Sequence, residues 1–281
     1  PNNLHASMTL EAVAVGVKGI YCEKPMATNM KDAKKMVAAC KKNNIALAIG
    51  HQRRMSPPYL KMRDLIKEGA IGDLELIRGT CAGDVLSDGT HTIDSILYLN
   101  GDKEINWVLG QIHREEAESE ETYVDDYSVF TGWRYGHVIE SGAMATFEFE
   151  NGVRGEILTG DIRFPGRLYQ DIEIFGTEGR IWRPGDQGDK EVLIWNKENS
   201  ESWREVSLQG YKKDNERENV FGKFADMVLN DSYFPLNGNN ALRGFEVVMS
   251  VYESSRIRDK IVLPLEQEKF PLEIMVENEK M

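Results

Sequence analysis

Residues 19–54 read GIYCEKPMATNMKDAKKMVAACKKNNIALAIGHQRR and carry the pattern of a parallel α/β layer. The run GIYCE predicts a short strand. Asn29 opens a helix that extends to about Lys42, with Asp32 in its first turn, where the helix dipole favours an acid. The segment IALAIG, residues 45–50, shows no polar alternation, so we expect a strand that is buried on both faces. A helix between two buried strands is typical of a parallel sheet.

The pattern changes on either side of this stretch. Before it, apolar residues at helical spacing predict a helix over residues 2–17. After it we expect a helix near 58–68, a strand near 74–80, a helix near 89–99, and two amphipathic helices around 220–229 and 240–258 that close the chain. Between them, AMATFEFE and VRGEILTG meet at Asn151-Gly152, a strong hairpin signal. The chain is therefore predicted to begin with part of a parallel α/β domain and to continue as a mostly antiparallel sheet with helices on one face.

Composition excludes several classes of protein. The 281 residues allow about two domains, and the formal net charge of −12 repels phosphate backbones, so nucleic acid is not an expected partner. No apolar run reaches the ~18 residues of a membrane span and the first residues lack a signal-peptide pattern, so we expect a cytoplasmic protein without membrane contact. The cysteines, Cys22, Cys40 and Cys81, lie far apart, and no set of side chains has metal-ligand spacing. Neither a disulfide framework nor a metal site is expected.

Five short motifs occur in an order that is typical of one protein family. They are PNNLH at residues 1–5, EKPMA at 23–27, GHQRR at 50–54, EGAIGDL at 68–74 and DGTHTID at 88–94. With them the chain resembles, over nearly its whole length, the glucose-fructose oxidoreductase / inositol dehydrogenase (Gfo/Idh/MocA) family. The resemblance implies the C-terminal portion of a Rossmann nucleotide-binding domain over residues 1–54. It implies a large open-faced, mostly antiparallel sheet domain over residues 55–281 that binds substrate and forms a homo-oligomer, a dimer or tetramer, through its sheet face.

The resemblance also implies NAD or NADP as cofactor and a sugar or polyol as substrate. A Rossmann domain holds its dinucleotide at a glycine-rich first turn, yet no G-x-G-x-x-G occurs in the chain. Pro1 matches a position well inside the nucleotide domain, so we expect a truncated chain in preference to a protein that has discarded its cofactor site. The residues that the resemblance places near the cofactor are Pro1, Asn2, His5, Glu23, Lys24, Pro25, Gln52 and Arg54. Arg54 could equally form a structural ion pair.

His91 is the leading candidate for the catalytic base. Oxidising a secondary alcohol needs a hydride acceptor and a base for the hydroxyl proton, and a histidine near its free pKa of ~6.5 is well suited to that task. On the predicted helix Asp94 lies three residues after His91, and Asp88 lies three residues before it. Either acid would favour the imidazolium and orient the ring. In the alternative interpretation Asp88 caps the helix and His91 is a hydrogen-bonded, partly buried polar residue.

Lys24 is the second catalytic candidate. It follows a strand and precedes Pro25, which keeps this corner of the chain extended. Ligands of open α/β sheets bind at the carboxyl ends of strands, so Lys24 can reach a substrate hydroxyl, and its cation would stabilise a developing alkoxide. A solvated lysine in a surface turn is the alternative, and the resemblance favours the active site.

One position departs from the family pattern. Many members carry an acid four residues before the histidine, where this chain has Ser87, and Asp88 stands one residue later. Two explanations remain open. Either Asp88 takes over the role through a locally shifted turn, or proton transfer relies on His91 and Lys24 alone.

The predicted function is hydride transfer between NAD(P) and a hydroxyl or keto carbon of a sugar, glycoside or cyclic polyol. Besides Lys24 and His91, the loop GDIRFPGRLY at residues 160–169 could bring Arg163 or Arg167 to the substrate. One alternative is NAD-assisted glycoside cleavage, in which transient oxidation of the sugar permits elimination. Another is a truncated, non-catalytic remnant that oligomerises or binds sugar.

Overall fold

The computed structural model describes residues 1–114, 132–160, 169–186, 191–199, 202–211 and 216–279. Its first part is the expected parallel layer. Strands β1 (Gly19–Cys22) and β2 (Ala46–Ile49) pair in parallel and are joined by helix α2 (Met30–Lys42). Asn29 caps α2, because its side chain accepts a hydrogen bond of 2.9 Å from the backbone N–H of Asp32.

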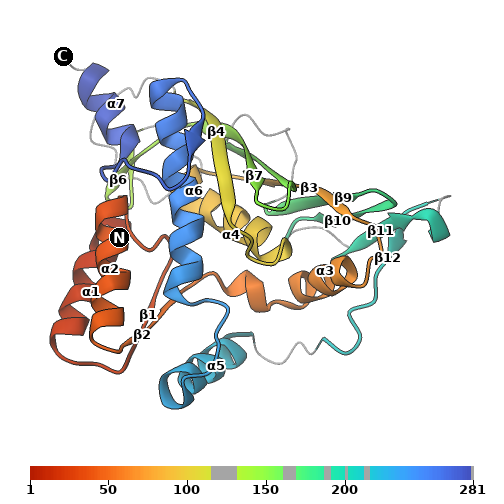
Figure 1. Cartoon of the computed structure of the whole chain (residues 1–281), viewed down its shortest axis with the longest axis horizontal. Helices are drawn as coiled ribbons and strands as arrows, with labels where there is room; N and C mark the ends of the chain where they lie inside the picture. The colour runs from red at the N-terminus through yellow and green to blue at the C-terminus, as the bar shows by residue number, and fades with distance from the viewer. Residues whose placement is uncertain (115–131, 161–168, 187–190, 200–201, 212–215, 280–281) are drawn as a thin grey trace.

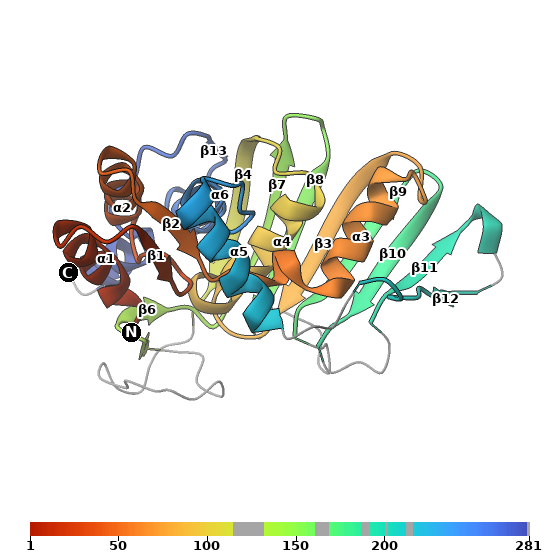
Figure 2. The same ribbon diagram turned by 90° about the horizontal axis from the view of Figure 1, so that it is seen from below.

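Helix α1 (His5–Ala14) is shorter than the expected helix over residues 2–17, because residues Asn2–Leu4 form a 3-10 turn, η1, and the helix ends before Gly16, whose φ is +78°. Helices α1 and α2 lie side by side, as Figures 1 and 2 show. Helix α5 (Glu216–Asn230) packs on β1 at Gly19, where a Cβ would lie 2.4 Å from the Val228 side chain. The absence of a side chain at Gly19 is what permits this close packing.

The second part of the chain is a mixed sheet of nine described strands in the order β12-β11-β10-β9-β3-β8-β7-β4-β13. Their bounds are β3 Leu74–Cys81, β4 Ile105–His113, β7 Gly142–Phe149, β8 Arg154–Gly160, β9 Asp171–Gly176, β10 Gly179–Pro184, β11 Leu193–Asn196, β12 Arg204–Glu205 and β13 Ile261–Val262. Strands β3 and β8 pair in parallel, and the other pairs are antiparallel. The mostly antiparallel sheet predicted from the sequence is confirmed, including the β7–β8 hairpin at Asn151-Gly152.

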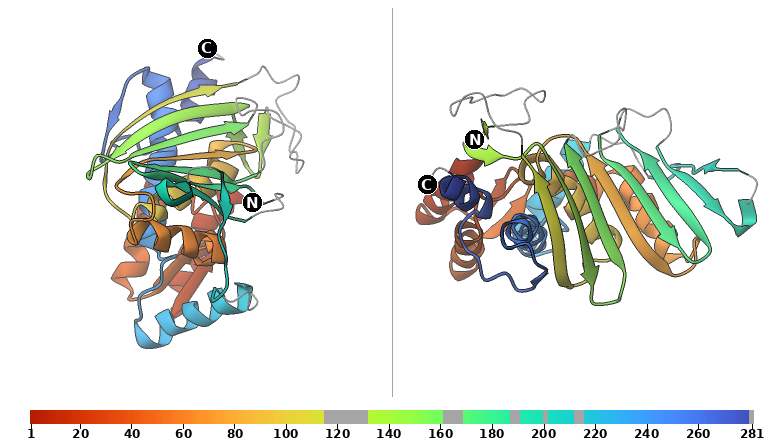
Figure 3. Two further views of the ribbon diagram at one scale, coloured as in Figure 1. Left: turned by 90° about the vertical axis from the view of Figure 1, so that its right-hand side faces the viewer. Right: turned by 90° about the horizontal axis from the view of Figure 1, so that it is seen from above.

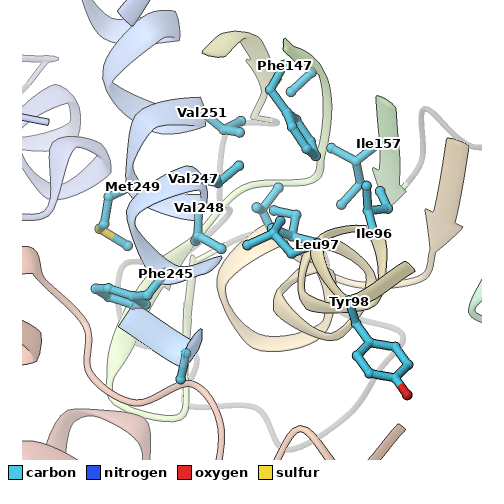
Figure 4. Close-up of a cluster of buried hydrophobic side chains, with 14 of the residues drawn as sticks. Ile96, Leu97, Tyr98, Phe147, Ile157, Phe245, Val247, Val248, Met249 and Val251 are labelled. Atoms are coloured by element: carbon cyan, nitrogen blue, oxygen red, sulfur yellow. The ribbon is translucent and has the colours of Figure 1, made fainter. Parts of the chain in front are cut away.

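Helices cover one face of this sheet and leave the other open, as Figure 3 shows. They are α3 (Pro57–Lys67), α4 (Thr90–Leu99) and α6 (Gly238–Ile257). The main core lies between them and the sheet, where Phe147 and Ile157 pack with Leu97 and Val248, all buried (Figure 4). Burial of such apolar side chains stabilises the fold by about 1.5–3 kcal/mol each.

Three further features complete the described fold. Strands β5 (Gly132–Arg134) and β6 (His137–Ile139) form a small separate hairpin. Helix α7 (Pro271–Glu279) follows the two helices that were expected to close the chain, so that prediction was wrong by one helix. A π-helical turn, η3 (Val85–Gly89), precedes α4 where the sequence suggested ordinary helix from residue 89.

Membrane and metal sites can be judged only for the part of the chain that the structure describes. None of its helices is long and apolar enough to cross a membrane. No group of three or more His, Cys, Asp or Glu side chains within it is placed to hold a metal ion. Its three cysteines are buried and free.

Candidate active site

Lys24 reaches from the carboxyl end of β1 to the π turn η3. Its ammonium Nζ donates a hydrogen bond of 2.6 Å to the backbone oxygen of Ser87 and lies 4.0 Å from Oδ1 of Asp88. The side chain is 21% exposed, so the ammonium lies at the border between the protein and solvent. Lys24 therefore lies where a cation could contact a ligand.

The π turn decides which side chain faces Lys24. The N–H of Gly89 donates to the carbonyl of Asp84, five residues back, which makes this turn wider than an α-helical one. The side chain of Ser87 faces His137, with Oγ 3.1 Å from Nε2. Asp88 is the acid that faces Lys24. The geometry therefore favours the explanation in which Asp88 takes the place of the acid through a locally shifted turn.

The tautomer of His137 follows from its partners. Its Nδ1 lies 2.9 Å from the backbone oxygen of Val138, which can only accept, so Nδ1 carries the proton. Nε2 then accepts from Ser87 Oγ and from Asn2 Nδ2, which lies 3.0 Å away. Asn2 is thereby bonded to both η3 and β6.

Asp88 is buried among charged and polar partners. Arg134 Nη1 lies 3.2 Å from its Oδ2, and the hydroxyl of Tyr169 donates to its Oδ1 over 3.3 Å. Burial and the neighbouring Asp84 raise the pKa of Asp88, while Lys24 and Arg134 oppose that shift. Two cations thus offset part of the cost of burying the Asp88 charge.

His91 is buried, and its Nδ1 has no hydrogen-bond partner among the described residues. Burial lowers its pKa well below 6.5, and the nearby cations Lys24 and Arg53 and the ring of His51 lower it further. The imidazole is therefore neutral at pH 7 and able to accept a proton. In the alternative interpretation His91 is a polar residue whose ring nitrogens are hydrogen-bonded, and Nδ1 does not have such a bond among the described residues.

The expectation that Asp94 orients His91 is not met. Both oxygens of Asp94 accept hydrogen bonds from Arg54, from Nε and Nη2, each over 2.8 Å. Arg54 Nη1 also donates to Asp102 over 2.7 Å, and the Arg54 side chain is fully buried. Helical spacing placed Asp94 near His91 on α4. The guanidinium of Arg54 can donate two hydrogen bonds at once, so it binds the Asp94 carboxylate more strongly than an imidazole would. Arg54 accordingly forms the structural ion pair, and its placement near the cofactor stays a prediction.

Two of the other residues that the resemblance placed near the cofactor, His5 and Glu23, lie beside the segments that follow β1 and β2. His5 Nδ1 lies 2.7 Å from the backbone oxygen of Pro25, and the Glu23 carboxylate lies so close over Gly50 that a Cβ there would be 2.8 Å from Oε2. Gln52 and Pro1 are exposed. Arg163 and Arg167 lie outside the described residues, so their predicted contact with substrate stays a prediction.

Sequence reasoning missed five residues at the site, which are Arg134 beside Asp88 and His51, Arg53, Tyr169 and Asp186. Arg53 forms a two-pronged pair with Asp186, which follows β10, and its guanidinium lies 5.6 Å from the ring centre of Tyr169. The ring of His51 lies 5.6 Å from that of His91. His51 and Arg53 belong to the quoted GHQRR motif, and Tyr169 ends the quoted loop. The motif and the loop therefore pointed to this region of the chain. His51 is followed by the 3-10 turn η2 (Gln52–Met55), and helical or strand spacing cannot tell which arginine of such a turn faces the site.

A buried acid lies beneath η3. Glu140 Oε1 accepts from the N–H of Val85 over 2.7 Å, and Oε2 accepts from the hydroxyl of Tyr252 over 2.8 Å. Burial, with Asp84 nearby, raises the pKa of Glu140 to about 8. Glu140 is therefore mostly protonated at pH 7 in the folded protein.

This raised pKa predicts a pH dependence of stability. The folded pKa of Glu140 is above its ordinary value of 4.5, so its contribution is fully present below that value and is lost as pH rises through about 8. The free energy of unfolding, measured by urea titration from pH 7 to 9, is expected to fall in the native protein. It should fall less in Glu140→Gln, which cannot ionise, than in the exposed control Glu75→Gln. Equal slopes for the two variants would contradict the assignment.

A parallel βαβ layer, with Lys24 after its first strand, joined to an open mixed sheet is the arrangement of a Rossmann-type first part followed by a larger sheet domain. Residues 1–51 match the family model for "Oxidoreductase family, NAD-binding Rossmann fold", and residues 59–182 match "GFO/IDH/MocA C-terminal domain". The chain belongs to the Gfo/Idh/MocA family of oxidoreductases.

Several relatives have described activities. Levoglucosan dehydrogenase of Pseudarthrobacter phenanthrenivorans is 30% identical over 207 residues, and myo-inositol 2-dehydrogenase of Thermotoga maritima is 26% identical over 195. Each match covers 64% of this chain and 53% of the relative, so the chain spans about half the length of these curated relatives. A solved structure of levoglucosan dehydrogenase with NADH and levoglucosan superposes with a TM-score of 0.74 at 22% identity. That superposition covers 94% of this chain and 79% of the other.

Proposed function

We propose that the protein containing this chain is an NAD(P)-dependent oxidoreductase that acts on a hydroxyl of a sugar, a glycoside or a cyclic polyol. The observation that carries the proposal is the buried imidazole of His91, whose Nδ1 has no hydrogen-bond partner among the described residues and whose pKa is lowered by burial and by the ammonium of Lys24. The levoglucosan and inositol dehydrogenases among the relatives support the substrate class. We propose residues 1–54 as the cofactor portion and residues 55–281 as the substrate domain.

The residues at the carboxyl ends of β1 and β2 fit the nicotinamide end of a dinucleotide. Lys24 presents a partly exposed cation there, and the buried Nδ1 of His91 has no hydrogen-bond partner among the described residues. When bound, the nicotinamide would exchange a hydride with the substrate carbon. The 281 residues contain no glycine-rich phosphate turn, so we assign the pyrophosphate to none of them.

Each side chain has a task that its geometry supports. His91 accepts the hydroxyl proton when the alcohol is oxidised and returns it when the ketone is reduced. Lys24 stabilises the oxygen as negative charge develops on it. Asp88 is a positioning residue, because its carboxylate, held by Arg134 and Tyr169, keeps the Lys24 ammonium near η3.

The experiment is a substrate panel with NAD and NADP that begins with levoglucosan and myo-inositol. We expect reduced cofactor and one oxidised product in equal amounts. A cofactor at 100 times its Kd should stabilise the protein by ~2.7 kcal/mol in a thermal-shift assay. Cleaved glycoside without net cofactor reduction would instead indicate transient oxidation and elimination. The absence of any shift or product would indicate a non-catalytic chain.

We also propose that the open sheet face forms a homo-oligomer. Leu109 and Met144 on this face are 46% and 49% exposed. They border a hollow of about 670 Å³ that also includes Arg78 and Glu156. Exposed apolar side chains mixed with charged ones are typical of interfaces between subunits. Sedimentation equilibrium would test the proposal, and a monomer at all concentrations would contradict it.

A further inference from the structure

Two arginines from distant parts of the chain converge on one carboxylate. Arg53, on η2, donates from Nη1 to Oδ1 of Asp186 over 2.8 Å and from Nη2 to Oδ2. Arg183, on β10, donates from Nη2 to the same Oδ1 over 2.5 Å. We call these three residues the Asp186 clamp. The clamp joins the segment after β2 to the end of β10.

The clamp is continuous with the candidate active site through Tyr169. The N–H of Asp186 donates to the backbone oxygen of Tyr169 over 2.9 Å, and the Arg53 guanidinium lies 5.6 Å from its ring centre. The hydroxyl of Tyr169 donates to Asp88, which faces Lys24. Tyr169 therefore links the clamp to the acid that faces Lys24, and we call Tyr169, Gln170 and the clamp the wall of the candidate site.

Gln170 holds Tyr169 in this position. Its side chain is fully buried, and its Oε1 accepts from the hydroxyl of Thr92 over 3.1 Å. Its backbone oxygen accepts from Arg183 Nη1 over 2.9 Å. The wall is thus bonded both to α4 and to β10, and its groups are positioned before any ligand binds.

Within the clamp, the guanidinium groups of Arg53 and Arg183 already bind a carboxylate, which is that of Asp186. A guanidinium fork matches the two oxygens of a carboxylate, and Arg53 holds Asp186 in this two-pronged way. Burial by itself would raise the pKa of Asp186, but Arg53 and Arg183 lower it overall, so the carboxylate is ionised at pH 7. Asp186 is 31% exposed, so its negative charge lies at the surface of the wall.

An acidic ligand would face two penalties at this wall. Its carboxylate would find the guanidinium forks filled, and it would be repelled by Asp186. A neutral sugar or polyol would meet neither penalty, because hydroxyl groups can donate to an ionised carboxylate.

We propose that Asp186 is a specificity residue that restricts the site to neutral sugars and polyols and excludes sugar acids. The inference rests on the proposed function for the location of the substrate, and it adds the charge class of that substrate. The charge of Asp186 engages the guanidinium donors of Arg53 and Arg183 and repels the carboxylate of a uronate.

The test is the binding of D-glucuronate and D-glucose to the native protein and to Asp186→Asn, by saturation-transfer NMR and calorimetry. Asparagine keeps the shape of Asp186 and removes its charge. We expect Asp186→Asn to bind glucuronate at least about tenfold more tightly than the native protein does, with little change for glucose. Adding Arg53→Gln should abolish the gain, because the fork that receives the carboxylate is lost.

Two controls separate this effect from others. Glu178→Gln makes the same change in net charge at an exposed ion pair with Lys197, and it should leave glucuronate binding unchanged. Asp186→Glu keeps the charge and should also show no gain. If Asp186→Asn does not fold, as judged by its thermal melt, Asp186→Ser takes its place.

The inference is overturned if the native protein binds glucuronate as well as glucose, or if neither uncharged variant gains glucuronate binding. Because these are binding measurements, they do not depend on turnover. A gain in glucuronate binding without oxidation of any sugar would reject the proposed function and support the carboxylate site.

Discussion

Replacing His91 by asparagine is expected to lower kcat for sugar oxidation by about 10²–10⁴-fold, the usual contribution of a positioned general base. Asparagine retains a polar group in the buried position but cannot take up the hydroxyl proton. KM should change little, because the proton is transferred only in the transition state. The measurement is steady-state kinetics on the protein that contains this chain, with the best substrate of the panel.

The matched control is His113→Asn, which makes the same substitution at an exposed position at the end of β4 and should leave kcat unchanged. The pH profile gives an independent check. Burial and nearby cations lower the pKa of His91 well below 6.5. We therefore expect kcat to stay constant as pH falls through 6.5 and to decline only at lower pH, where His91 becomes protonated. Full turnover of every oxidised sugar by the His91 variant would show that the base is elsewhere.

Replacing Arg54 by methionine is expected to destabilise the protein by about 3–5 kcal/mol, the usual cost of removing one partner of a buried ion pair. The substitution leaves the Asp94 carboxylate, which is only 2% exposed, without its two-pronged partner. It also removes the donor to Asp102. The free energy of unfolding from urea titration measures the effect.

Arg154→Met is the matched control. Arg154 pairs with Glu148 over 3.0 Å on the sheet surface, where an ion pair contributes about 0–1 kcal/mol. The double variant Arg54→Met with Asp94→Asn should recover part of the stability, because it no longer buries an unpaired charge. Equal losses in the two arginine variants would mean that burial does not strengthen the Arg54 pair.

Much of the fold could be predicted because it depends on local patterns. The buried run 45–50, the cap at Asn29 and the hairpin at Asn151-Gly152 each reflect neighbours along the chain, and the structure shows all three. Helix α7 was not predicted, and its residues 271–279 are less regularly amphipathic than the other helices. The ordered motifs identified the family from residue types alone.

The candidate site could be predicted only in part, because helical spacing names neighbours on one helix and not partners across the fold. Lys24 and His91 came from motif and spacing. The same spacing suggested Asp94 as the partner of His91, whereas the structure pairs Asp94 with Arg54.

The sequence alone determined the parallel layer, the antiparallel sheet and the family, and it predicted Lys24 and His91 as the two principal side chains of the site. The tertiary structure alone decided which acid faces Lys24, which arginine of GHQRR faces the site, and that Asp186 joins Arg53 to Arg183. The physical reason is that the apolar residues of a helix or strand recur at regular spacing along the chain, so the sequence shows which face is buried. The pairing of buried charges depends on which distant segments the packed core brings together.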